Sequence, residues 1–185
     1  IGLVLLSPLY IILALMIYID DPDGSPLFWQ ERVGKDGRIF KFYKFRTMYI
    51  DAEDELENLL DKNEMQGPPF KMQNDPRITR FGNKLRATSL DELPQLWNVL
   101  KGDMSIVGPR PPLPREAAQY SDHEKTRLSI KPGLTCYWQT CSKRNSVSFD
   151  EWVNLDIQYI NDRCLRVDLM LIFKTLLVIF SKEGE

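Results

Sequence analysis

The sequence predicts an α+β fold that is mainly helical, with a re-entrant membrane helix at its start, a small β-hairpin, and amphipathic helices at a membrane interface. Three observations predict this class. Residues 1–19 are uncharged and apolar, residues 26–48 place aromatic and β-branched residues on both sides of a glycine-bounded turn, and later segments have apolar residues at helical spacing. We divide the chain into the membrane helix (1–19) and one cytoplasmic domain (20–185). Because the first residue is Ile, we expect further sequence before it.

The apolar start, IGLVLLSPLYIILALMIYI, would extend about 28 Å as one helix, near the thickness of a hydrocarbon core. Pro8 lies inside it without an N–H to donate, and Ser7 can hydrogen-bond a carbonyl that the break frees. We therefore favour a helix that bends at Ser7-Pro8 and returns to the side it entered; a straight span or a buried core helix are the alternatives. Cations that follow place the rest of the protein in the cytoplasm by the positive-inside rule. They are Arg32, Lys35, Arg38, Lys41, Lys44 and Arg46.

The next elements follow from local patterns. Residues 26–48 predict a hairpin that turns at Gly34-Lys35-Asp36-Gly37. Residues 51–64 predict an exposed acidic helix with Leu56, Leu59 and Leu60 on one face. The other expected segments are a loop at 66–77, a helix after Asp91 with the stripe Leu93, Leu96, Val99 and Leu100 that stops at Gly102, a proline-stiffened loop at 107–114, helices at 116–128 and 149–163, and a core or interfacial helix at 168–180.

Composition narrows the possible functions. The 185 residues can bury one core, and the formal charge of −2 excludes a strongly basic, nucleic-acid-binding protein. Lys and Arg nevertheless gather in residues 32–46, 77–86 and 101–115, which indicates local anion sites. Three cysteines without a CxxC pair argue against a disulfide scaffold or a zinc site.

The acidic pair Asp91-Glu92 has two interpretations. Ser89 and Glu92 match the S-x-x-E capping box, which would make the pair a helix cap. Alternatively, a helix that starts at Asp91 leaves Pro94 in its first turn, where the missing N–H costs nothing. Asp91 at that helix end stays ionised and can attack a phosphoryl centre if cations neutralise the phosphate oxygens. The candidate cations are Arg86, Lys101, Arg110, Lys44 and Arg46, and Glu92 could hold Mg²⁺.

Seven motifs occur in order along the chain: Ser7-Pro8 in the apolar run, FWQERVG, FKFYKFRTM, DPRITRFG, LRATSLDELPQLWNVLKGDMSIVGPRP, KPGLTCYWQ and FDEWVNLDIQYI. In this series the chain resembles the bacterial sugar transferase family, monotopic phosphoglycosyl transferases that move a sugar phosphate from a UDP-sugar to a polyprenol phosphate such as undecaprenyl phosphate. Each motif alone is weak, whereas the ordered series is specific and covers nearly the whole chain.

The resemblance implies a role for each matching residue. Asp91 would be the nucleophile that takes the phosphosugar and expels UMP, and Glu92 would help to hold Mg²⁺. Arg110, between two prolines, would contact phosphate, and so would Arg86 and Lys44. The product would begin glycoconjugate or exopolysaccharide synthesis at the cytoplasmic face of the bacterial inner membrane.

The resemblance also bears on the Ser-Pro pair, on two residues of the second half of the chain and on the oligomeric state. Ser7-Pro8 corresponds to the break at which the family's helix re-enters the cytoplasm. We assign Arg144 to nucleotide contact, with a surface arginine as the alternative. Cys136 stands where the family usually has Gly, so the backbone there is expected to differ. We also consider a homo-oligomer possible.

Two other functions compete with this assignment. Asp21-Pro22-Asp23 could be a DxD metal site of a glycosyltransferase that releases UDP, although a polar turn explains it more simply. The chain could also be a non-catalytic, membrane-docked module that binds nucleotide sugars. The sequence does not identify the sugar.

Overall fold

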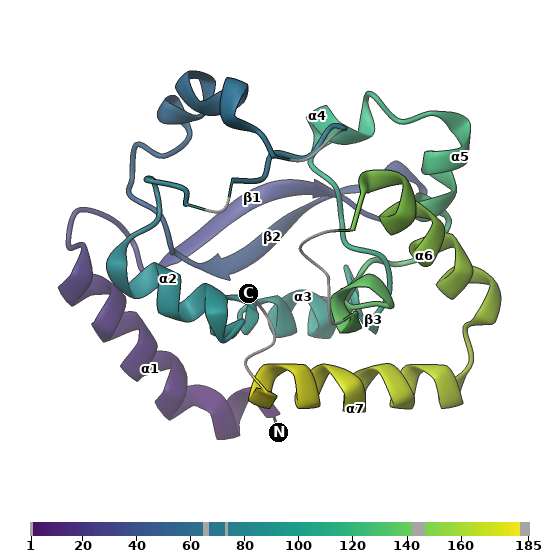
Figure 1. The fold of residues 1–185 in the computed structure, drawn as a ribbon. Helices are drawn as coiled ribbons and strands as arrows, with labels where there is room; N and C mark the ends of the chain where they lie inside the picture. Colours follow the sequence, from purple (N-terminus) through teal and green to yellow (C-terminus); the bar gives the residue numbers. More distant parts are fainter. Residues whose placement is uncertain (1, 65–66, 73, 142–146, 182–185) are drawn as a thin grey trace.

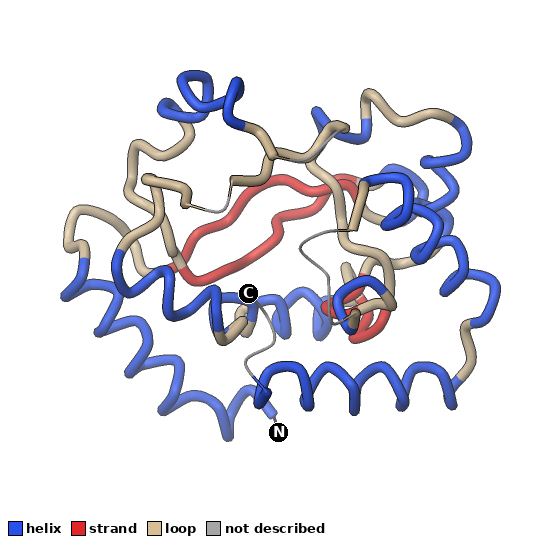
Figure 2. Tube along the Cα trace, viewed as in Figure 1, coloured by secondary structure: helices blue, strands red, loops and turns tan. Residues whose placement is uncertain are grey.

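A β-hairpin lies at the centre of the molecule, with helices around it (Figures 1 and 2). The computed structural model describes residues 2–64, 67–72, 74–141 and 147–181. Strands β1 (Leu27–Val33) and β2 (Ile39–Phe45) pair antiparallel in register. Asp36 and Gly37, with φ of 55° and 80°, turn the chain through the left-handed region that glycine favours. The predicted hairpin and its turn are confirmed.

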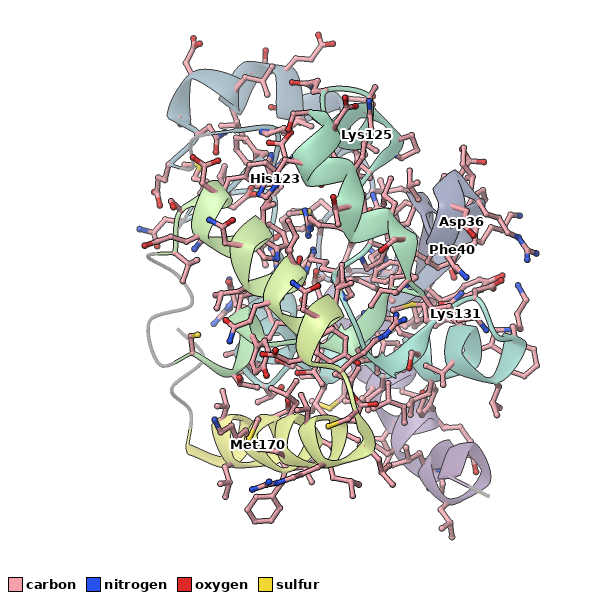
Figure 3. The ribbon with its side chains drawn as sticks, turned by 90° about the vertical axis from the view of Figure 1, so that its right-hand side faces the viewer. Asp36, Phe40, His123, Lys125, Lys131 and Met170 are labelled. Atoms are coloured by element: carbon pink, nitrogen blue, oxygen red, sulfur yellow. The ribbon has the colours of Figure 1, made fainter. Side chains whose placement is uncertain are left out.

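Helices α1 (Gly2–Asp20) and α7 (Leu165–Ser181) both lie along the lower side of the molecule in Figures 1 and 3. Both were predicted as helices, and α1 continues through Pro8. Within the described ranges, no helix is long and apolar enough to cross a membrane. The re-entrant course of α1 therefore stays a prediction.

The acidic pair lies between two short helices. Helix α2 (Arg80–Ala87) was not predicted; the 3₁₀ turn η3 (Leu90–Glu92) follows it and leads into α3 (Gln95–Lys101). Gly102 ends α3 in the left-handed conformation, as predicted. The predicted apolar stripe is partly wrong, because Leu100 is exposed while the polar Asn98 is buried.

The acidic segment after the hairpin forms a 3₁₀ helix, η2 (Asp54–Lys62), and not an α-helix. With three residues per turn, Leu56 and Leu59 share the buried face, whereas Leu60 points to solvent. The prediction that all three leucines share one face is therefore wrong.

A second, smaller sheet was missed by the sequence patterns. β3 (Ser105–Val107) and β4 (Gly133–Thr135) pair in parallel. A Cβ atom on Gly133 would lie 2.2 Å from the backbone nitrogen of Gly108. Glycine at this position therefore allows the two chain segments to approach closely.

The remaining helices form the side of the molecule seen in Figure 3, where His123 and Lys125 lie far from Met170 of α7. The predicted helix at 116–128 is broken into short pieces, whereas the one at 149–163 is confirmed. The helices in this part of the molecule are α4 (Pro114–Ala117), α5 (Asp122–Lys125), η4 (Thr126–Ser129), η5 (Trp138–Thr140) and α6 (Phe149–Asp162).

Separate apolar clusters hold these elements together. One joins Leu13 and Ile17 of α1 to Phe45 and Leu85, and another joins Val107 and Cys136 to Tyr159 and Leu171. All three cysteines are free thiols, of which Cys136 is buried as a small apolar side chain and Cys164 is exposed.

Candidate active site

A cavity of about 730 Å³ runs along one face of the hairpin and reaches the η3 turn. Side chains of a strand alternate between its two faces, and the cavity takes those of Phe28, Gln30, Arg32 and Lys44. Its lining also includes Arg86, Asp91, Glu92 and Arg110. The structure therefore brings five of the predicted site residues into one cavity: Lys44, Arg86, Asp91, Glu92 and Arg110.

The capping interpretation of the acidic pair is wrong. Ser89 adopts the left-handed conformation, with φ of 55°, and its side chain makes no capping hydrogen bond. The carboxylate of Glu92 instead lies among cations at the cavity wall. Asp91 and Glu92 thus occupy a turn whose acidic groups are directed to the cavity and not to their own helix.

Lys44 on β2 is the cation nearest to both carboxylates. Its Nζ lies 3.6 Å from Oδ2 of Asp91 and 3.3 Å from Oε1 of Glu92. The amide of Asn98 fixes α3 against β2, because it accepts from the Tyr43 N–H at 3.2 Å and donates to the Lys41 carbonyl at 2.6 Å. A buried side chain of one element therefore sets the register of the other, and with it the position of Lys44.

Arg110 lies near the same carboxylate oxygen as Lys44, with Nη1 3.9 Å from Oε1 of Glu92. The prolines around it have no N–H to donate, so the segment is held by its carbonyl oxygens. Each carbonyl from residue 109 to residue 112 accepts a hydrogen bond. The donors, in order, are the Gly133 N–H, the Arg127 guanidinium, the Arg32 guanidinium and the Val33 N–H.

Arg86 reaches the cavity from the last turn of α2. This helix packs directly on the chain after β2, since a Cβ on Gly82 would lie 2.1 Å from the Thr47 carbonyl oxygen. The Thr79 side chain caps the helix by accepting from the Gly82 N–H at 2.9 Å. The exposed Arg86 side chain is close enough for its charge to lower the pKa of Asp91.

Arg32 also lines the cavity, and the sequence analysis did not identify it as a site residue. Its side chain is buried, and it donates to Gln30 Oε1 at 3.1 Å and to the Pro111 carbonyl at 3.0 Å. In the part of the chain that the structure describes, Arg32 forms no ion pair. Burial lowers the pKa of Arg32 to about 9, which leaves it charged at neutral pH. In the strand FWQERV, side chains alternate between the two faces, so Arg32 lies on the same face as Gln30 and Lys44. This alternation could have been used to find Arg32 from the sequence.

Burial raises the pKa of Asp91 from its ordinary value, and the charge of Lys44 opposes that shift. The α-helix that was expected to begin at Asp91 begins at Gln95 instead, so the helix end that was to hold Asp91 ionised lies further along the chain. The Asp91 side chain is only 7% exposed, so loss of water outweighs the nearby cation. A desolvated carboxylate beside cations is a stronger base and nucleophile than one in water.

The acidic pair suits a metal ion that arrives with a phosphate ligand. Among the described residues, no group of three or more His, Cys, Asp and Glu side chains could hold a metal ion. Mg²⁺ commonly binds one or two carboxylates and completes its coordination with substrate phosphates and water. Glu92, partly exposed in the cavity beside Asp91, offers that donor set.

Of the other predicted candidate cations, Arg46 also lines the cavity, but its charge is paired within the protein. Lys101 pairs with Asp103 at 3.1 Å, and Arg46 forms a buried ion pair with Asp21 at the end of α1. One carboxylate of Asp21-Pro22-Asp23 is therefore already paired with Arg46, which favours a polar turn over a metal site at this motif. Ser7 and Pro8 lie within α1, and Arg144 falls outside the described residues.

Comparison with known proteins identifies relatives. The bacterial sugar transferase family profile matches residues 1–182. The galactosyl transferase CpsE of Streptococcus agalactiae is 52% identical over 88% of this chain. The undecaprenyl-phosphate galactose phosphotransferase of Salmonella typhimurium is 43% identical over 98%, and the UDP-glucose:undecaprenyl-phosphate glucose-1-phosphate transferase of Escherichia coli is 39% identical over 94%. The matched regions span 36%, 38% and 36% of these relatives, respectively.

Proposed function

The chain belongs to the bacterial sugar transferase family, and we propose that it transfers a sugar phosphate from a UDP-sugar to undecaprenyl phosphate, or a similar polyprenol phosphate, with release of UMP. Relatives whose names specify these substrates support the proposal. Residues 20–185 would form the catalytic domain and residues 1–19 the membrane helix.

One observation carries this proposal: a buried carboxylate lies in a cavity whose walls supply more cations than the carboxylates need. Lys44 and Arg110 lie within 4 Å of the acidic pair, and Arg32 and Arg86 line the same cavity. A diphosphate would add the missing negative charge. Guanidinium and ammonium groups in a water-poor cavity stabilise phosphate oxygens much more strongly than they do in bulk water.

The proposed reaction has two displacements. A carboxylate oxygen of Asp91 attacks the β-phosphorus of the UDP-sugar, the bond to the bridging oxygen breaks, and UMP leaves with that electron pair. A phosphate oxygen of the polyprenol phosphate then attacks the phosphorus held on Asp91. The acyl-phosphate bond breaks, Asp91 regains its charge, and a polyprenyl diphosphate sugar is formed.

The surrounding residues would hold the phosphates during both steps. Lys44 lies against both carboxylates, so it can orient Asp91 and neutralise the attacked phosphate. Arg110, in a segment fixed by its carbonyl oxygens, and Arg32 would also hold the diphosphate. Mg²⁺, when bound by Glu92, would supply further neutralisation of phosphate oxygens.

The position of apolar side chains supports a site at a membrane surface. α1 and α7 lie on the same side of the molecule (Figure 1), and both carry large exposed apolar residues. Those on α1 include Leu5, Ile11, Leu15 and Ile19; those on α7 include Leu165, Leu169, Phe173 and Leu177. We propose that these faces meet the lipid bilayer at the cytoplasmic side of the bacterial inner membrane, where a lipid acceptor and a soluble donor can share one cavity.

The test is to incubate the purified protein with UDP-galactose or UDP-glucose and Mg²⁺, first without the lipid acceptor. The expected result is a burst of at most one UMP per protein and a mass increase of one hexose phosphate on the peptide that contains Asp91. Undecaprenyl phosphate should then remove the adduct and restore turnover. Release of UDP would indicate direct glycosyl transfer, and absence of turnover with either donor would favour a non-catalytic binding module.

A further inference from the structure

The apolar helix α1 contacts the back of the turn that carries the acidic pair. Leu13 and Ile17 of α1 are buried in a cluster that also receives Leu90 and Leu93. These two leucines bracket Asp91 and Glu92 in the sequence. The turn therefore has an apolar side against α1 and an acidic side toward the cavity.

Tyr10 makes the polar contact in this interface. Its hydroxyl donates a hydrogen bond to the carbonyl oxygen of Leu93. Its ring lies 5.4 Å from the ring of Phe45, the residue after Lys44. One side chain of α1 thus contacts both the turn with the carboxylates and the strand end with their nearest cation.

The carbonyl of Leu93 lies where the chain passes from the 3₁₀ turn into α3. The next residue is Pro94, which has no N–H to donate, and the Leu93 carbonyl also accepts from the Leu96 N–H at 3.0 Å. Hydrogen bonds in a 3₁₀ turn are poorly aligned, so a turn of three residues depends on outside contacts to keep its orientation. A rotation at this junction would change the distance between Lys44 and both carboxylates.

The C-terminal end of α1 is fixed independently. The Asp20 carboxylate accepts from the Phe81 N–H at 2.9 Å at the start of α2, and Asp21 pairs with Arg46. Loss of the Tyr10 hydroxyl therefore leaves α1 attached, through these contacts and through the apolar cluster. The hydroxyl can be removed without removing the helix.

We propose that α1 is part of the catalytic support and that Tyr10 is a positioning residue, whose hydrogen bond to Leu93 sets Asp91 and Glu92 relative to Lys44. The inference rests on the proposed function, since its readout is UMP release. It gives the membrane helix a second role: the element that meets the bilayer also orients the nucleophile.

The test compares Tyr10→Phe with wild type in detergent or vesicles, with the burst of UMP followed in the absence of lipid acceptor. We expect a burst rate about threefold to tenfold lower, the effect of one hydrogen bond, at full burst amplitude. In steady state, kcat should fall by the same factor while KM for the UDP-sugar stays unchanged. Tyr18→Phe is the matched control, because Tyr18 lies on the same helix with a side chain that is 54% exposed.

The burst separates positioning from folding, since its amplitude counts competent protein and its rate reports the geometry of the attack. A Tyr10→Phe rate within twofold of wild type would overturn the inference. A lower amplitude at an unchanged rate, or an equal loss in Tyr18→Phe, would overturn it as well. Absence of UMP from the wild-type protein would overturn the proposed function together with this inference, and so would be distinguished from a failure of Tyr10 alone.

Discussion

Asp91 and Asp156 are both buried carboxylates beside cations, but of the two only Asp156 is within hydrogen-bond distance of its cation. Two nitrogens of Arg127 contact Oδ2 of Asp156 at 2.7 and 2.8 Å, and Arg127 also donates to the Tyr120 hydroxyl at 3.0 Å. Asp91 has Lys44 at 3.6 Å, outside hydrogen-bond distance, and shares it with Glu92.

Burial raises the pKa of both carboxyl groups, and an opposing cation limits the shift in each case. The difference lies in what else can reach them. Asp156 is fully buried and is not among the residues that line the cavity, and Arg127 covers it beside the Trp152 ring, whereas Asp91 lines the cavity itself. The first pair is a structural element, and the second has charge left for a ligand.

The largest expected effect is on chemistry. Asp91→Asn should reduce the rate of the UMP burst by at least about 10⁴-fold, as loss of a nucleophile does in other enzymes, while the protein stays folded. Asp36→Asn in the hairpin turn is the control, because that side chain is 74% exposed. Retention of more than a few per cent of the rate would remove the distinction between the two carboxylates.

The second prediction concerns stability. Arg127→Met leaves the Asp156 charge buried without its partner, so the free energy of unfolding in urea should fall by about 3–5 kcal/mol. Arg110→Met should change it by less than about 1 kcal/mol, because the pair with Glu92 is long and partly exposed. Similar losses in the two variants would contradict the comparison.

The third prediction sharpens the role of Lys44. Lys44→Met should lower kcat about 100-fold, because a cation at the reacting phosphate is lost. Lys44 lowers the pKa of Asp91, so its removal should move the acid limb of the pH–rate profile to higher pH. Lys41→Met, over the Trp29 ring on the other face of β2, should leave both quantities unchanged.

The smallest effect is a gain in stability. Folded Asp91 binds its proton more readily than the unfolded chain, so its charge destabilises the fold above the raised pKa, and this cost disappears as pH falls toward 3.8. Asp91→Asn should therefore be about 0.5–2 kcal/mol more stable than wild type at pH 7.5, with a smaller advantage at pH 4. Thermal unfolding at the two pH values measures this; a gain independent of pH would contradict the assignment to Asp91's charge.

Three S-x-x-E patterns explain why local sequence predicted the helices better than the site. Ser121 with Glu124 and Ser148 with Glu151 form capping boxes at the starts of α5 and α6. Ser89 with Glu92 does not, because Ser89 lies between α2 and η3 in the left-handed conformation and Glu92 lies beside Lys44 and Arg110. Identical local patterns differ here through contacts with residues distant in sequence.

The features that the sequence did not predict also depend on contacts between residues that are distant in the sequence or on elements too short to give a pattern. Asn98 is buried because it bonds to the backbone of β2, which helical periodicity does not indicate. The short parallel pair of β3 and β4 has too few residues to produce an alternating pattern. The hairpin, the long helices and the cationic residues around Asp91 were predictable, because strand alternation, helical spacing and family motifs each act over a short stretch.

The way in which residues 109–112 are held has a consequence for how such enzymes diversify. Because the attachment uses main-chain oxygens, side chains in this stretch can be exchanged while the path of the backbone is kept. Side chains that follow this stretch on the cavity wall could therefore change while the backbone that carries Arg110 is kept, and libraries that vary Leu113 and Arg115 are a rational starting point for changing the donor.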